Sequence, residues 1–256
     1  MKYFDANTWT GRWPFSFCDE HTPRSLAAHL RAHGIRRALV SPLEAVFAPE
    51  PGPANRALLR ATRSVAGLEP VPVINPALAN WREELDVVAA DPRVRAVRLL
   101  PNYHNYRLNI RAVDELLADL AERDLRLILQ VRLIDHRHEY HAMKLKPLPV
   151  KELTALLVRQ PRLPVLASGL LLPELLQLAP QFPRLLADLS FVEWHDTLEY
   201  VRQKVPARQL ALASHTPLLI TAAARAKLDS STLPTTERAA IAADNLERWL
   251  GRGEKS

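Results

Sequence analysis

The sequence predicts an α/β protein of the (β/α)8 TIM-barrel class, with one domain over residues 1–256. Short runs rich in Val, Leu and Ile alternate with longer segments of helical periodicity. Eight such units in 256 residues match the usual size of this barrel. An open doubly wound sheet is the alternative. It is disfavoured because no glycine-rich phosphate loop follows the first run, and the chain has only 7 glycines.

Eight apolar runs are the expected strands. They read as nearly continuous apolar stretches, which is typical of strands buried on both faces of a parallel sheet. In chain order they are residues 3–7, 37–42, 70–76, 94–101, 126–132, 163–168, 185–190 and 209–214.

The segments between these runs have the periodicity of amphipathic helices. In IRAVDELLADLAERD, the residues Ile110, Val113, Leu117 and Leu120 lie on one helical face. Two stretches, at about 8–22 and 134–150, are expected to be insertions at the barrel rim. The longest apolar stretch, residues 163–180, is interrupted by three prolines and a glutamate, so it predicts a strand, a turn and a helix, not a membrane span.

Composition narrows the location and the partners. Cys18 is the only cysteine, which excludes an internal disulfide and favours a reducing compartment. No secretory signal is visible, so we expect a soluble, cytoplasmic protein. The formal charge of +6 is spread along the chain without a basic block or interleaved aromatic residues. We therefore expect a small anionic substrate and no nucleic-acid or membrane partner, and the sequence leaves open whether the chain forms a homo-oligomer.

Polar side chains gather at the carboxyl ends of the expected strands. Active sites of such barrels lie on this face, because the strand ends and the following loops converge there. Asp5 and Asn7, spaced i, i+2, are expected on the same side of their strand. The whole set is Asp5, Asn7, Ser41, Asn75, Arg98, Gln130, Arg132, Ser168, Ser190, Ser214 and His215.

The members of this set differ in what they indicate. Ser41, Asn75 and Ser214 lie near prolines and are typical of turn and capping positions. Arg98 and Arg132 are expected to face the barrel interior or its mouth, where an unpaired charge costs several kcal/mol. Each arginine therefore needs an anionic partner, which is either a carboxylate of the chain or that of a substrate.

The order of these motifs is similar to that in the amidohydrolase superfamily, most closely its amidohydrolase-related TIM-barrel branch. That branch includes decarboxylases and lactone hydrolases that act on carboxylates. The resemblance spans nearly the full chain and rests on FDANTW, VRAVRLLPNYHNY, LILQVR, LPVLASG, LALASHTP and NLERWLG. It implies a metal site built from D-x-H or H-x-H on the first strand, histidines ending the fifth and sixth, and an aspartate ending the eighth.

The chain departs from this pattern at most ligand positions. Asn7, Gln130 and Ser168 stand where the resemblance implies histidines, and His215 stands where it implies the acid. Amide and hydroxyl oxygens are poor ligands for zinc. We therefore expect no tightly bound metal, and we expect these polar groups to hydrogen-bond a substrate.

Two other groups are candidate metal ligands. A divalent metal at a relocated site would use His195, Glu193, His215 or Asp5. The histidines of DHRHEYH, which are His136, His138 and His141, are more typical of a solvated rim loop, because HEYH lacks the i, i+4 spacing of a helical site.

The candidate catalytic residues are His215, His195 and Asp5. Both histidines follow expected strand ends, and imidazole suits proton transfer near neutral pH. Trp9, in an aromatic loop after the first strand, and His104, after the fourth, are expected to line the substrate pocket.

These residues favour a hydrolase that acts on a small ester, lactone or amide bearing a carboxylate. Arg98 or Arg132 would bind the carboxylate, Asn7 and Gln130 would polarise the carbonyl, and a histidine such as His215 would activate water. A non-catalytic relative that binds a small anion is one alternative. A hydrolase or decarboxylase with a relocated metal is another. The hydrolase is favoured because buried polar groups are costly to maintain without use.

Overall fold

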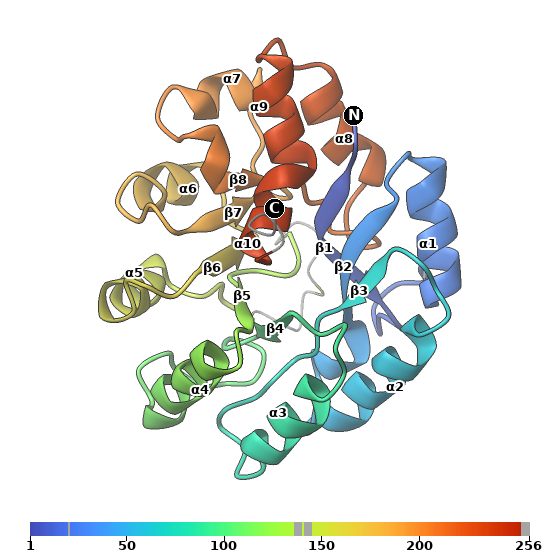
Figure 1. The fold of residues 1–256 in the computed structure, drawn as a ribbon, viewed down its shortest axis with the longest axis vertical. Helices are drawn as coiled ribbons and strands as arrows, with labels where there is room; N and C mark the ends of the chain where they lie inside the picture. Colours follow the sequence, from blue (N-terminus) through green and yellow to red (C-terminus); the bar gives the residue numbers. More distant parts are fainter. Residues whose placement is uncertain (20, 136–139, 141–144, 252–256) are drawn as a thin grey trace.

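The computed structural model describes residues 1–19, 21–135, 140 and 145–251. It confirms the TIM-barrel prediction: parallel strands lie at the centre and helices surround them (Figure 1). The strands form a three-stranded sheet, β1-β2-β3, and a five-stranded sheet, β4-β5-β6-β7-β8. They are β1 (Phe4–Thr10), β2 (Arg37–Pro42), β3 (Leu68–Pro70), β4 (Ala96–Leu99), β5 (Arg126–Gln130), β6 (Val165–Ser168), β7 (Leu186–Asp188) and β8 (Leu210–Ala211).

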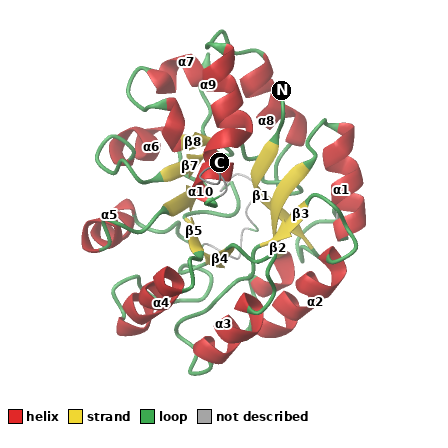
Figure 2. Ribbon diagram, in the orientation of Figure 1, coloured by secondary structure: helices red, strands yellow, loops and turns green. Residues whose placement is uncertain are grey.

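Helices cover the outer face of the strands (Figure 2). The first eight are α1 (Pro23–Ala32), α2 (Gly52–Thr62), α3 (Trp81–Ala89), α4 (Arg111–Glu122), α5 (Val150–Arg159), α6 (Leu172–Leu178), α7 (Thr197–Arg202) and α8 (Thr221–Asp229). The last helix runs through α9 (Thr235–Ala239), the π-helical segment η3 (Ala240–Asp244) and α10 (Asn245–Trp249). Short 3-10 turns follow β2 (η1, Leu43–Ala45) and precede β8 (η2, Ala207–Gln209). In the described residues, no helix is both long and apolar enough to cross a membrane.

Backbone hydrogen bonds join the two sheets into a closed ring. At one seam, Val73 and Arg98 form an isolated parallel bridge between the chain after β3 and strand β4. At the other seam, the N–H of Ala6 donates to the carbonyl of Leu212 at 2.9 Å. The third strand ends at Pro70, earlier than expected, because Pro70 and Pro72 have no N–H to donate to a ladder.

The lower layer of the barrel interior is apolar and is closed from below by the last helix. It takes one residue from each strand or its continuation: Phe4, Leu39, Val71, Ala96, Ile128, Leu166, Leu186 and Ala211. Leu246 and Trp249 of the last helix, and Leu250 directly after it, pack against this layer. Because side chains alternate along a strand, residues two positions further on face inward at the next level. At that level, toward the barrel mouth, strands β4 to β7 carry the polar side chains Arg98, Gln130, Ser168 and Asp188.

A bulge in β1 determines which side of the strand Asp5 occupies. Against β2, the pairing advances three residues on β1, from Asp5 to Thr8, and two on β2. Phe4 and Ala6 belong to the interior cluster, so Asp5 between them faces the surrounding helices. After the bulge, Asn7 faces the interior. The structure therefore differs from the expectation that Asp5 and Asn7 share one side, because the extra residue breaks the alternation.

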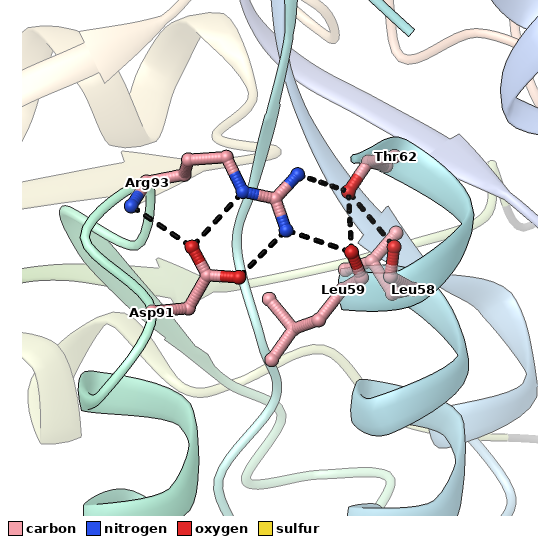
Figure 3. Close-up of polar contacts among 5 residues, drawn as sticks. All are labelled: Leu58, Leu59, Thr62, Asp91 and Arg93. Atoms are coloured by element: carbon pink, nitrogen blue, oxygen red, sulfur yellow. Dashed lines mark hydrogen bonds and ion pairs between the residues drawn. The ribbon is translucent and has the colours of Figure 1, made fainter. Parts of the chain in front are cut away.

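Arg93 fastens α2 to the loop that precedes β4 (Figure 3). Its Nη2 donates to the carbonyl of Leu59 at 2.7 Å, and its Nη1 donates to Oγ1 of Thr62 at 3.2 Å. Asp91 accepts from Nε at 2.9 Å and from Nη2 at 2.6 Å, and these bonds lower the pKa of Asp91. The guanidinium thus satisfies groups in the last turn of α2, where carbonyls lack helical partners.

Replacing Arg93 with alanine should lower the free energy of unfolding by about 1–3 kcal/mol, because buried acceptors lose their donor. Urea denaturation followed by circular dichroism measures this change. Arg60→Ala, at an exposed position of the same helix, is the control and should stay within about 0.5 kcal/mol of wild type. Equal stability of the two variants would contradict the role given to Arg93.

Candidate ligand site at the barrel mouth

Polar side chains from around the ring meet at the carboxyl ends of the strands. Each is 0% exposed. They come from β1, β4, β5, β6, β7 and the loop after β8, and they are Asn7, Arg98, Gln130, Ser168, Asp188 and His215. We call these residues the mouth cluster. Five of them were predicted from the sequence to lie at this end of the barrel, and Asp188 was not.

Asn7 is the hub of the mouth cluster. Its Nδ2 lies 2.6 Å from Ser168 Oγ, 2.6 Å from His215 Nδ1 and 3.1 Å from Asp188 Oδ2. Its Oδ1 accepts from Arg98 Nη1 at 2.9 Å. The amide N–H groups are therefore directed at acceptors of the protein. They are not free to polarise a substrate carbonyl in this arrangement.

Asp188 is held by donors on both of its oxygens. Oδ2 accepts from Ser168 Oγ at 2.5 Å in addition to Asn7, and Oδ1 accepts from the N–H and the hydroxyl of Ser190 at 3.2 and 2.6 Å. The N–H of Gly169 adds a longer bond of 3.3 Å. These bonds stabilise a buried carboxylate. Asp188 could have been found from the sequence, because it is an acidic residue inside an apolar strand run. A buried acid requires hydrogen-bond donors as partners.

Arg98 is a buried cation with donors to spare. Nη1 donates to Asn7 Oδ1 and to Gln130 Oε1, and the guanidinium lies 4.3 Å from the ring centroid of Trp9. Nε and Nη2 have no hydrogen-bond partner in the described part of the chain. Burial lowers the pKa of Arg98 to about 9, and the nearby charge of Asp188 opposes that shift. The group is thus positively charged at neutral pH and incompletely paired.

His215 is a buried, neutral imidazole. Its backbone adopts a φ of 58°, which turns the side chain into the mouth after β8. Nε2 lies 2.6 Å from the carbonyl of Leu133, and since a carbonyl only accepts, we assign the proton to Nε2. Nδ1 then accepts from Asn7. Burial lowers the pKa of His215 to about 4, so the ring is uncharged at neutral pH.

Asp5 lies on the other side of β1 from the mouth cluster. Its Oδ1 accepts from the backbone N–H groups of Asn7 and Ser214, both at 3.0 Å, while Oδ2 has no hydrogen-bond partner among the described residues. Burial raises the pKa of Asp5 to about 7. The carboxyl therefore positions the backbone of β1 and of the segment after β8.

Other candidate residues lie apart from the mouth cluster. Arg132 donates through both terminal nitrogens to Glu174, at 2.6 and 2.7 Å, so it is paired within the protein. His104 Nε2 lies 3.0 Å from the carbonyl of Ala45, and His195 is exposed in the loop before α7. In the described part of the chain, none of these three side chains bonds to a cluster side chain. His136, His138 and His141 lie outside the described residues.

An apolar layer covers the mouth cluster. It consists of Trp9, Leu43, Ala45, Val46, Val73, Leu100 and Leu133. Above it, a group of rim aromatic rings has centroids 5.2 to 5.8 Å apart: Trp13, Phe15, Phe47, Tyr103 and Tyr140. The free donors of Arg98 consequently lie in a region of low dielectric, where attraction to an anion is stronger than in water.

No family model matches the chain, and no curated protein matches it. Solved structures do. A 5-carboxyvanillate decarboxylase from Novosphingobium aromaticivorans, crystallised with manganese and 4-hydroxy-3-methoxy-5-nitrobenzoic acid, has a TM-score of 0.75 at 13% identity, over 97% of this chain and 96% of its own. A 2,6-dihydroxybenzoate decarboxylase from Rhizobium has a TM-score of 0.69 at 14% identity, over 98% and 99%. A probable 2-pyrone-4,6-dicarboxylic acid hydrolase from Acinetobacter baumannii, with citric acid bound, has a TM-score of 0.65 at 15% identity, over 98% of this chain and 100% of its own.

These structural neighbours are decarboxylases and a pyrone hydrolase of the amidohydrolase-related TIM-barrel superfamily. The resemblance inferred from the sequence is therefore confirmed as a resemblance in fold. At 13% to 15% identity the likeness establishes the fold of this chain.

Two of the neighbouring structures contain manganese. The oxygen and nitrogen atoms of the mouth cluster that could bind such a metal ion do not fit it. Asn7 Oδ1 and Gln130 Oε1 already accept from Arg98, and His215 Nδ1 accepts from Asn7. A buried guanidinium beside them also repels a second cation. Among the described residues, no three His, Cys, Asp or Glu side chains are grouped to hold a metal. The relocated set is dispersed as well, since Glu193 pairs with Lys227 at 2.7 Å.

The buried side chains of Asp5 and His215 have opposite effects on stability as pH changes. The pKa of Asp5 is raised to about 7, so folding retains a proton, and the stability it contributes is lost as pH rises towards 7. The pKa of His215 is lowered to about 4, so folding excludes a proton, and its contribution grows as pH rises from about 4 to 6.5. In wild type, the Asp5 and His215 contributions to the unfolding free energy therefore change with pH in opposite directions.

Asp5→Asn should remove the contribution of Asp5 to stability, which falls as pH rises. The asparagine side-chain oxygen should still accept from the two backbone N–H groups. We expect the unfolding free energy of the variant to rise more steeply with pH between about 4 and 6.5 than that of wild type, because the Asp5 contribution that opposes the rise is gone. Urea denaturation at a series of pH values measures both curves. Parallel curves would contradict the raised pKa of Asp5.

Proposed function

We propose that the chain binds a small carboxylate at the barrel mouth and hydrolyses an ester, lactone or amide bond next to that carboxylate. The observation that carries the proposal concerns the fully buried Arg98: its Nε and Nη2 have no hydrogen-bond partner among the described residues. A guanidinium edge with two N–H groups matches the two oxygens of a carboxylate.

The charges of the mouth favour an anionic ligand. Arg98 has no carboxylate within hydrogen-bond distance in the described part of the chain, and Asp188 is already satisfied by hydroxyl and amide donors. A ligand carboxylate would supply the missing partner. The indole Nε1 of Trp9, also buried and unpartnered among the described residues, lies beside the same guanidinium and offers a further donor. The solved neighbours with a bound nitrobenzoic acid and with citric acid support a carboxylate ligand.

His215 is the proposed base. With its proton on Nε2, the ring presents a lone pair at Nδ1 toward the cluster. A water that takes the place of the Asn7 amide at Nδ1 would give its proton to the ring while its oxygen attacks the carbonyl carbon. The departing alcohol or amine would then receive that proton. A pKa of about 4 makes this imidazole a weak base, so we expect slow turnover.

A non-catalytic role in binding small anions is the second candidate. Two observations favour it: both ring nitrogens of His215 are occupied by the protein, and the apolar layer covers the cluster. This candidate shares the Arg98 anchor and differs only in chemistry. Binding and turnover must therefore be measured separately.

Arg98→Met should weaken the binding of benzoate or citrate by about thirtyfold or more, because a desolvated charge pair is lost. Isothermal titration calorimetry measures the affinity, and Arg98→Lys, which keeps the charge without the fork, should give an intermediate value. Arg132→Lys shows which arginine binds the carboxylate. An affinity unchanged in Arg132→Lys supports Arg98. An affinity lost in Arg132→Lys but kept in Arg98→Met assigns the carboxylate to Arg132. Wild-type protein that binds neither probe would contradict the proposal.

His215→Asn should retain carboxylate binding and lose turnover by about a hundredfold or more, as expected for removal of a general base. The assay is a panel of esters, lactones and amides that bear a carboxylate, with binding measured on the same preparations to show that the site is intact. Turnover equal to wild type would remove His215 from the mechanism. Saturable binding by wild type with no turnover across the panel would favour the non-catalytic role.

A further inference from the structure

Exposed arginines recur at the end of the barrel opposite the mouth. In this fold, the connections that lead from each helix to the next strand lie at the amino ends of the strands. Six exposed arginines in these connections, in the last turn of α2 or in α10 form no ion pair within the described part of the chain. We call them the basal arginines: Arg36, Arg60, Arg162, Arg184, Arg208 and Arg248.

Most carboxylates at this end are already paired with other arginines. The pairs include Arg37 with Glu69 and Glu247, Arg93 with Asp91, Arg123 with Asp86, and Arg126 with Asp124. Glu122 and Asp244 are exposed carboxylates that form no ion pair among the described residues. The six basal arginines outnumber these two carboxylates, so this end of the barrel carries an excess of positive charge.

Hollows lined by arginines open between the helices at the same end. Four of them have volumes of 480 to 740 Å³. Each is lined by at least two arginines, such as Arg36 and Arg37 at the start of β1, or Arg60 and Arg63 between α2 and α3. A guanidinium binds phosphate oxygens through its paired N–H groups. Each hollow is therefore a place where a phosphate group can meet more than one arginine.

The basal arginines are distributed around the barrel axis. The helices surround the strands (Figure 1), so the connections after α1, α2, α5 and α6 lie on different sides of the axis. The last helix, which carries Arg248, closes this end of the barrel. Charges placed around and across one end can contact a flat surface together. A rod-shaped partner contacts only those along one line.

We propose that this end of the barrel binds the surface of a lipid bilayer that contains anionic phospholipids. Phosphates of the headgroups would meet the arginine-lined hollows, and the barrel mouth, at the opposite end, would face water. An anionic bilayer attracts basic residues that lie within about a Debye length of its surface. The proposal goes beyond the proposed function and does not depend on any turnover at the mouth.

The fold explains why the sequence did not predict this surface. We expected no membrane partner because the basic residues are spread along the chain without a block. Helix-to-strand connections recur along the whole chain, and the barrel brings them all to one end. Residues as far apart in sequence as Arg36 and Arg208 therefore belong to one surface.

The positions of the exposed aromatic rings favour a bilayer over nucleic acid. Proteins that bind single strands stack the bases on aromatic side chains. The exposed aromatic residues of the described chain are Phe15, Phe17, Phe47, Tyr140 and Trp194, and all belong to strand-to-helix connections at the mouth. The basal end thus offers charge without a stacking surface. A duplex, as a rod, would leave part of the ring of arginines unused.

Co-sedimentation with vesicles tests the proposal. The probes are vesicles of phosphatidylcholine alone and vesicles in which about a third of the lipid is phosphatidylserine. We expect wild type to bind only the anionic vesicles and to dissociate in about 0.5 M salt, because salt screens exposed charges. The combined variant Arg36→Gln, Arg162→Gln and Arg208→Gln should bind about a hundredfold more weakly, since each basic residue near such a surface contributes roughly fivefold.

A matched variant separates the basal end from net charge. Arg12→Gln, Lys146→Gln and Lys151→Gln together remove the same charge from exposed positions near the mouth and should leave vesicle binding close to wild type. Circular dichroism checks that both combined variants are folded. An equal loss in the two combined variants would overturn the proposal, as would wild type that binds neither kind of vesicle or binds both equally.

Two further probes test other partners for the same arginines. Tighter binding to a DNA duplex than to anionic vesicles, lost in the basal variant, would overturn the proposal and assign this end to nucleic acid. Saturable binding of inorganic phosphate without any binding to vesicles would overturn it in favour of a small phosphate ligand. Vesicle binding by a protein that binds no carboxylate supports the proposal and rejects the proposed function alone.

Discussion

The buried guanidinium of Arg98 is the constraint on which the barrel mouth depends. It comes from strand β4, where its side chain faces the barrel interior, and it donates to the amide oxygens of Asn7 and Gln130. Because those oxygens are occupied, the Asn7 amide turns its N–H groups toward Ser168 and His215. The remaining hydrogen bonds of the cluster follow from that orientation. A single cation thus orders a site whose amides would otherwise have no fixed direction.

The fold, and the location of five of the six mouth-cluster residues, follow from the sequence. Apolar runs of strand length, separated by amphipathic segments, specify a parallel barrel, and alternation within each run then places Arg98, Gln130 and Ser168 two residues above an apolar layer. Polar residues at strand ends were therefore informative. Asp188 belonged to the same pattern, and its position inside a buried run was the signal that it needs donors.

The side on which Asp5 lies was not predictable in the same way. A bulge is set by the pairing of β1 with β2 and with the segment after β8, which single-strand alternation does not contain. The pairing of Arg132 with Glu174 likewise depends on where α6 begins relative to β5. The direction of the Asn7 amide depends on Arg98, a residue 91 positions away. Long-range geometry of this kind decides which polar residues are free for a ligand.

The central claim is that a carboxylate binds to the free edge of Arg98. The most direct measurement is the 15N resonance of the Arg98 Nε–H group, assigned with Arg98→Lys and followed as benzoate is added. A saturable shift of that resonance, with smaller changes at Arg132, is the result this account predicts. An Arg98 resonance that does not move while benzoate binds elsewhere would contradict it.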